Sequence, residues 1–233
     1  MGLGALSSAM SGMRGAQRRL DLASHNISNA QTPGYQRQVV EQRAAGTDSA
    51  SGVFSGSVIA PGGAIQLGIS RVTDVGLTNR LIQSAGEGAT LETTAEQLKR
   101  LEAVFPEPHE NALGSQFAQF WAAWQGVSNQ PSSSAARTAL LAQAEALTSS
   151  LQKAATDVTE LSFDASSRLN LMVTEVNDLA RELAGVSSSI LAGDPNLSAT
   201  QDLYSRRDYL AAQLAEKTGG RVNVMAEGTF QFL

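Results

Sequence analysis

The sequence predicts a mainly α fold: an elongated antiparallel helical bundle or coiled coil, with an N-terminal amphipathic helix and a few short strands. Three observations support this class. Apolar residues recur at a spacing of three and four over residues 3–27 and again over residues 134–191. Aromatic residues make up only 5% of the 233 residues, which argues against a large globular core. Abundant Ala, Ser, Gln, Leu and Glu with six Pro is typical of long helices.

The N-terminal helix carries a narrow apolar seam. Its small side chains cannot stabilise a helix alone, so we expect the seam to be an assembly interface with partner helices. The helix should stop near Gln31, because Pro33 lacks an N–H and Gly34 permits the positive φ of a type II turn at residues 32–35. The predicted interface residues are Leu3, Leu6, Met10, Met13, Leu20 and Ile27.

Residues 36–73 differ from the helical parts. Gln38 to Glu41 could form a short strand, and the Gly-, Ser- and Ala-rich stretch 44–63 should be extended or mobile. Alternating apolar residues predict a second strand over residues 65–72.

The helical pattern returns at residue 74. A helix over residues 77–105, weakened around Gly86 and Gly88, should end at the prolines of residues 106–108. A shorter helix over residues 113–127 carries an aromatic stripe, which is either a partner groove or packed core. We favour core, because large aromatics are otherwise scarce in the bundle. The stripe consists of Leu113, Phe117, Phe120, Trp121, Trp124 and Val127.

A long helix should begin at Ser133 or Ser134 as N-cap and continue to about residue 191. Its seam is heptad except at residues 161–169, where two steps of four relax the supercoil. A break at residues 193–196 precedes an antiparallel helix capped by Ser198 or Thr200 and ended by residues 219–220. The seam of the long helix is Leu140, Ala144, Leu147, Leu151, Ala154, Val158, Leu161, Ala165, Leu169, Met172, Val176, Leu179, Leu183, Val186 and Ile190.

Two strands are expected over residues 221–225 and 229–232, about a turn at residues 226–228. Because the chain stops within the second strand, we expect it to be a fragment. The predicted segments are an assembly helix and turn (1–35), a partly β linker (36–73), a helical bundle (74–218) and the start of a truncated β region (219–233).

Other classes of function find little support in the sequence. The net charge of −5 does not favour nucleic acid or an anionic membrane surface, and no apolar run is long enough to span a membrane. Cysteine is absent, and the two histidines lie far apart, so no metal or cofactor is expected. Residues 150–153 fit S-x-x-K and residues 217–219 fit K-T-G of penicillin-binding enzymes. The middle element is missing and Ser150 lies within the heptad helix, so we predict no enzyme.

One segment resembles a known family. Residues 26–37 are similar to the N-I-A-N-x-x-T-P-G-Y-x-R signature of the bacterial flagellar rod, hook and hook-associated family, with Ser28 replacing a common Ala and Gln31 a common Asn. The matching residues are Asn26, Ile27, Asn29, Thr32, Pro33, Gly34, Tyr35 and Arg37. Residues 202–210 also resemble a D-L-x-x-x-R-D-x-L segment of the hook-associated branch.

The resemblance implies a non-catalytic structural subunit, an adaptor at the hook–filament junction whose N-terminal helix folds on assembly. The implied partners are further copies in a ring, hook protein, further hook-associated proteins, the flagellar export apparatus and an export chaperone. It also implies an extracellular place in the flagellum, export without a cleaved signal peptide, and a missing part with β-rich outer domains and a C-terminal helix that pairs with the N-terminal one.

Two alternatives remain. A rod or hook subunit would show few helices after residue 75. A generic coiled-coil scaffold or secretion adaptor would leave the signature at residues 26–37 unexplained.

Overall fold

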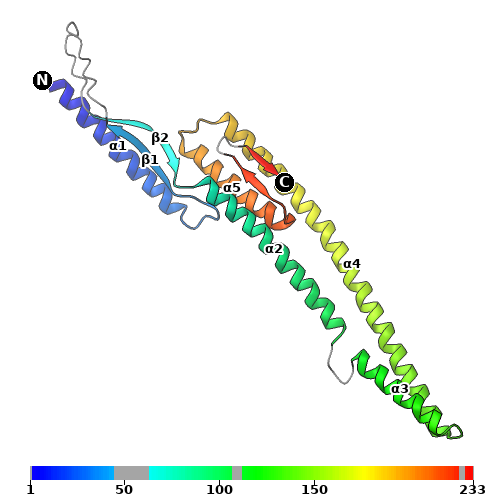
Figure 1. Ribbon diagram of the computed structural model, residues 1–233. Helices are drawn as coiled ribbons and strands as arrows, with labels where there is room; N and C mark the ends of the chain where they lie inside the picture. The colour runs from blue at the N-terminus through cyan, green and yellow to red at the C-terminus, as the bar shows by residue number, and fades with distance from the viewer. Residues whose placement is uncertain (1, 45–62, 107–111, 226–228, 233) are drawn as a thin grey trace. The chain divides into compact units, whose positions relative to one another are not determined.

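The computed structural model describes residues 2–44, 63–106, 112–225 and 229–232 (Figure 1). The described residues confirm a mainly α fold with minor antiparallel strands. They form two compact units, residues 1–89 with 176–233, and residues 90–175. In chain order the elements are α1 (Gly2–Ser28), β1 (Gln38–Ala44), β2 (Ala64–Arg71), α2 (Val75–Val104), α3 (Leu113–Asn129), α4 (Ser134–Ala192), α5 (Ser198–Thr218), β3 (Val222–Val224) and β4 (Phe230–Phe232).

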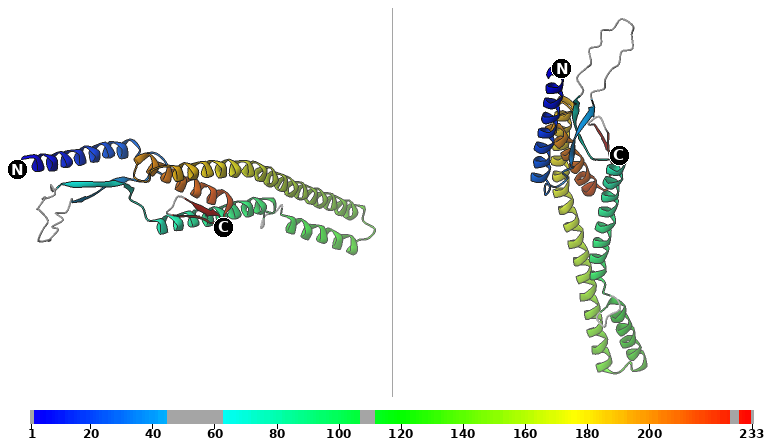
Figure 2. Two further views of the ribbon diagram at one scale, coloured as in Figure 1. Left: turned by 90° about the horizontal axis from the view of Figure 1, so that it is seen from above. Right: turned by 90° about the vertical axis from the view of Figure 1, so that its left-hand side faces the viewer.

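The first unit contains α1 lying along a β-hairpin (Figure 2). β1 and β2 pair antiparallel from Gln38↔Arg71 to Ala44↔Ala64, with a register shift between Glu41 and Gln42. Both strands were predicted, but their pairing was not. The segment expected to be extended or mobile lies mostly at residues 45–62, outside the described residues.

The core of this unit joins the first half of α2, the last part of α4, α5 and the β3–β4 hairpin. β3 alternates buried and exposed side chains and pairs antiparallel with β4, which confirms the predicted strands. The predicted turn at residues 226–228 lies outside the described residues. The core side chains are Ile82, Leu183, Leu210, Ala211, Leu214, Ala215, Val222 and Val224.

Gly86 lies within an unbroken α2 rather than at a weak point. A Cβ at this position would come within 3.1 Å of the carbonyl oxygens of Ala215 and Gly220. The glycine therefore allows α2 to approach the end of α5, and this packing offsets its poor helix propensity.

In the second unit, α3 lies antiparallel beside the first part of α4 (Figure 2). Of the two predicted N-caps of α4, Ser133 caps the helix: its Oγ accepts the N–H of Ala136 at 3.2 Å. The predicted seam of α4 is buried at Leu147 and Ala154, whereas Leu169 is 61% exposed. The expected continuous seam is therefore wrong in the middle of α4, where the two steps of four rotate the stripe around the helix.

The expectation that the aromatic stripe of α3 forms packed core is largely wrong. Phe117, Trp121 and Trp124 are 42%, 61% and 54% exposed. The half-buried face of α3 includes Phe120 and Ala123. Each residue turns a helix by about 100°. Trp121 and Trp124, which follow Phe120 and Ala123 by one position, are therefore rotated away from the half-buried face.

Two helix ends differ from prediction. α1 ends at Ser28, three residues before Gln31, because the Ser28 hydroxyl and the Asn29 amide both donate to the carbonyl of His25. α5 has Leu197 at its N-cap with no side-chain cap, because Ser198 donates its hydroxyl to the side chain of Gln38. Neither Ser198 nor Thr200 is the cap.

We predict that Leu183→Ala lowers the free energy of unfolding by about 2–5 kcal/mol, because it leaves a cavity at a fully buried position. Leu191→Ala is the matched control, since Leu191 lies in the same helix and unit but is 66% exposed. Urea unfolding followed by circular dichroism measures both. Equal losses for the two variants would contradict the assigned core.

Candidate assembly site

α1 presents two different faces. Leu22 is buried against the hairpin, and the guanidinium of Arg19 donates to the side chain of Gln42 on β1. The predicted seam is exposed, and the side chain of Leu3 lies outside the described residues. The exposed fractions are 57% for Leu6, 41% for Met10, 64% for Met13, 68% for Leu20 and 76% for Ile27.

The carboxamide of Asn26 fastens the end of α1 to β1. Its Nδ2 donates to the carbonyl of Gln38 at 2.9 Å, and its Oδ1 accepts the N–H of Gln38 at 2.9 Å. The hydroxyl of Tyr35 donates to the same Oδ1 at 2.8 Å. Asn26 thus satisfies both main-chain groups of Gln38, as a neighbouring strand would.

The side chain of Gln38 continues this network into α5. It is 1% exposed, and its Nε2 donates to Asp202 at 2.6 Å while its Oε1 accepts the hydroxyl of Ser198 at 2.6 Å. His25 of α1 also pairs with Asp202, with 3.1 Å between Nε2 and Oδ2. We call Asn26, Gln38, Ser198 and Asp202 the polar latch. It joins α1, β1 and α5.

The turn after α1 packs directly on α5. The N–H of Tyr35 donates to the carbonyl of Thr32 at 3.1 Å, and Gly34 has the predicted positive φ, 75°. A Cβ on Gly34 would come within 2.5 Å of the side chain of Tyr209. Glycine is therefore required both by the backbone conformation and by the contact with α5.

The family-signature residues have different environments. Asn29 and Thr32 bond to each other across the turn at 3.2 Å, between Oδ1 and Oγ1, and Arg37 uses its carbonyl to accept the N–H of Val72 at 2.9 Å. The side chains of Pro33 and Arg37 are exposed. The signature therefore supplies Asn26 of the latch and the turn, while Ile27 belongs to the exposed seam.

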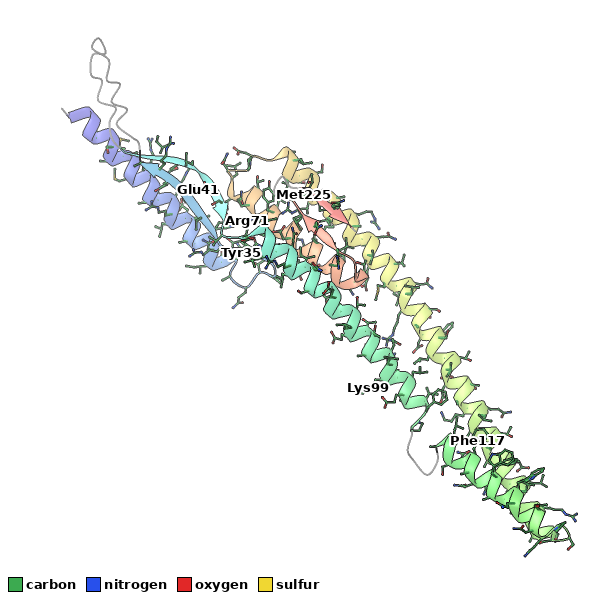
Figure 3. The ribbon with its side chains drawn as sticks, viewed as in Figure 1. Tyr35, Glu41, Arg71, Lys99, Phe117 and Met225 are labelled. Carbon is green, nitrogen blue, oxygen red and sulfur yellow. The ribbon has the colours of Figure 1, made fainter. Side chains whose placement is uncertain are left out.

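A buried charge cluster also lies on α5, around Asp208. Asp208 accepts from Arg71 of β2 at 2.8 Å and from Arg207 at 2.7 Å, and all three side chains are at most 7% exposed. Both guanidinium carbons lie 5.0 Å from the ring centroid of Tyr204. Arg207 also donates to the carbonyl of Met225 at 2.9 Å. The shared carboxylate and the aromatic face compensate the two buried cations. Figure 3 labels Arg71 and Tyr35.

Sequence reasoning missed part of this site. Gln38 was predicted only as a strand residue, and its polar side chain gave no sign of burial. Asp202 and Asp208 lie in the segment 202–210 that resembled the hook-associated branch, but their partners Gln38 and Arg71 lie more than 130 positions away. The resemblance of residues 202–210 was therefore the one sequence signal that pointed to Asp202 and Asp208 as site residues.

The arrangement holds elements together by hydrogen bonds and ion pairs. Within the described residues, no group of three or more metal-ligating side chains gathers. No helix among them combines the length and apolar character required to cross a membrane. Ser150 lies inside α4 and Lys217 in the last turn of α5.

We predict that Asn26→Ala lowers the free energy of unfolding by about 1–3 kcal/mol, because it leaves the main chain of Gln38 without its partner. Asn170→Ala in α4 is the control at an exposed asparagine and should be neutral or slightly stabilising. Urea unfolding gives the stability, and amide hydrogen exchange at Gln38 locates the effect. Unchanged exchange at Gln38 in Asn26→Ala would contradict the latch.

Burial, and then the negative charge of Asp202, raise the pKa of Tyr35 above 10.0. A raised folded-state pKa contributes stability below the unfolded pKa, and that stability is lost as the pH rises through the folded value. The free energy of unfolding of the native chain should therefore fall more steeply above pH 10 than that of Tyr35→Phe. Equal slopes in urea unfolding across this range would contradict the burial of the phenol.

Two parts of the chain match known protein families. Residues 98–232 match the flagellar hook-associated protein FlgK helical domain, and residues 6–36 match the flagella basal body rod protein family. Flagellar hook-associated protein 1 of Salmonella typhimurium (strain LT2) is 26% identical over 227 residues, covering 97% of this chain and 40% of that protein.

The proteins of the same name from Escherichia coli (strain K12) and Bacillus subtilis (strain 168) are 25% and 26% identical. They are covered over 40% and 46% of their lengths. The chain thus spans less than half the length of these relatives. Since the helical-domain match covers more than half of the chain, the chain belongs to the family of the FlgK helical domain.

Proposed function

We infer that the chain is part of a structural, non-catalytic subunit of the bacterial flagellum, an adaptor at the hook–filament junction. The observation that carries this proposal is the exposed apolar seam of α1 on a helix whose other face is fastened to the hairpin and α5. The two family matches and the names of the relatives support the flagellar setting.

The proposed mechanism is assembly-coupled burial of the seam. Full burial of an apolar side chain contributes about 1.5–3 kcal/mol. The five described seam residues are 41–76% exposed. Covering their remaining surface would contribute roughly 6 kcal/mol. Ordering the groups that meet would consume part of this sum, so α1 needs neighbouring helices to complete its packing.

The polar latch fixes how the captured helix is oriented relative to β1 and α5. Because Asn26 and Gln38 hold α1 against β1 and α5, a neighbour that captures α1 also orients the unit to which the helix is fastened. The turn at residues 32–35 would then set where the chain leaves the inner helical layer. The four-segment division of residues 1–35, 36–73, 74–218 and 219–233 remains a prediction about how the chain is organised.

The proposed partners are further copies in a ring, hook protein and further hook-associated proteins, with an export apparatus and an export chaperone acting before assembly. The proposed location is the extracellular part of the flagellum.

A rod or hook subunit is the alternative that one observation favours, namely the rod-family match at residues 6–36. Against it stand the helices α2 to α5, which follow residue 75, and the helical-domain match. A generic coiled-coil scaffold does not account for the match at residues 6–36.

We predict that Leu6→Asp or Leu20→Asp abolishes saturable capture of the complete reading-frame product by purified, filament-free hooks, because a carboxylate cannot be buried in the seam without a partner. Leu171→Asp is the matched control and should be captured normally, because Leu171 is 69% exposed against 68% for Leu20 but lies in α4. Cosedimentation measures capture, and circular dichroism should show retained helicity in all variants.

Three results would count against the proposal. Loss of capture in Leu171→Asp would remove the special role of α1. Normal capture of Leu20→Asp would remove the seam from the interface. No capture of the unmodified protein would favour a different axial subunit or a scaffold.

A further inference from the structure

The middle of the α1 seam consists of methionine. Between Leu6 and Leu20 the only large apolar side chains are those of Met10 and Met13, because the other residues of this stretch are Ala, Gly, Ser, Gln and Arg. Met10 is 41% exposed and Met13 is 64% exposed. They stand three positions apart, so both lie on the same side of the helix. Over this part of α1 the exposed apolar surface is therefore that of two thioether side chains.

The two thioethers have open surroundings. Among the described residues, a Cβ on Gly12, which lies between them, would meet nothing within 4 Å apart from its chain neighbours and the backbone of its own helix. The hydroxyl of Ser11 donates to the carbonyl of Ser8 at 2.8 Å and is thus turned along the helix. Cysteine is absent from the sequence, so thioethers are the only sulfur groups that an oxidant can modify. Oxidation of a methionine to the sulfoxide converts a flexible apolar side chain into a polar one.

We propose that Met10 and Met13 form an oxidation site for hydroperoxides, and that its modification prevents α1 from entering an assembly. A lone pair of the sulfur attacks one peroxide oxygen, so that an S–O bond forms while the O–O bond breaks. With hydrogen peroxide, the proton of the attacked oxygen passes to the leaving oxygen, which departs as water. The sulfur is oxidised by two electrons and the peroxide is reduced by two. The consequence for assembly rests on the proposed function.

The modification acts on docking and leaves the fold of the free chain intact. Neither methionine belongs to the polar latch, and both side chains are open to solvent. Water can therefore hydrate the sulfoxide oxygen in the free chain. When a neighbouring helix covers the seam, that oxygen loses its water, and burial of a polar group without a partner is unfavourable. For the two sulfoxides together we expect capture to weaken roughly ten- to hundredfold.

The site is accessible only before assembly. A covered seam keeps peroxide away from the sulfur atoms, so captured copies should resist oxidation at Met10 and Met13 while free copies are modified. Met225 provides the matched reference, because it is 46% exposed but follows β3, outside the seam.

The test treats the complete reading-frame product with hydrogen peroxide and measures its capture on filament-free hooks by cosedimentation. Peptide mapping by mass spectrometry gives the oxidised fraction of each methionine. Capture should fall at least tenfold as Met10 and Met13 become sulfoxides, and peptide methionine sulfoxide reductases for both epimers should restore it. Circular dichroism should show unchanged helicity. Normal capture with both residues oxidised, a loss that the reductases do not reverse, or a loss of helicity would overturn the proposal.

Two variants locate the effect. The double variant Met10→Leu, Met13→Leu is compared with its own untreated sample and should keep its capture after peroxide, because its seam contains no thioether. Met225→Leu should lose capture on treatment as the native chain does. A loss in the double variant, or protection by Met225→Leu, would place the damage elsewhere and overturn the assignment.

The outcomes distinguish this inference from the proposed function. Normal capture of a protein oxidised at both methionines would overturn the oxidation site and leave the junction role intact. Equal oxidation of Met10 and Met13 in the free and captured protein would overturn the claim that assembly covers them. Absence of capture of the untreated protein would contradict both the inference and the proposed function.

Discussion

Gln38 is the residue on which the arrangement of α1, β1 and α5 depends. Asn26 holds both of its main-chain groups, and Ser198 and Asp202 hold both ends of its carboxamide. The side chain is buried, and a buried polar group must keep its hydrogen bonds. Moving α1 away from α5 would break several of these bonds together. The helix that carries the seam is therefore held in place by polar contacts, whose geometry is specific.

The two segments that resembled flagellar proteins meet in the fold. The first, residues 26–37, supplies Asn26 and the turn at Gly34; the second, residues 202–210, supplies Asp202 and the side chain of Tyr209 that packs on that turn. Asp208 of the second segment adds the buried pair with Arg71. Contacts within one chain thus explain Asn26, Gly34, Asp202, Asp208 and Tyr209 of these segments, whereas Ile27 lies in the exposed seam of α1.

Local rules predicted the elements well. The periodicity of α1 and α4, the cap at Ser133, the positive φ at Gly34 and the stop at Gly219 all follow from neighbouring residues. Contacts between distant residues were not predictable in this way. Ser198 has the chemistry of an N-cap, yet it bonds to Gln38 at a separation of 160 residues. The stripe of α3 was assigned to the core because periodicity identifies a face without saying what covers it.

The central claim is that the outer face of α1 is the surface that assembly covers, while the latch is already formed in the free chain. Amide hydrogen exchange of the complete reading-frame product, free and captured on filament-free hooks, tests it most directly. The account predicts that exchange across α1 slows markedly on capture, while Gln38 is protected in both states. Equal exchange of α1 in the two states, or protection of Gln38 only after capture, would contradict it.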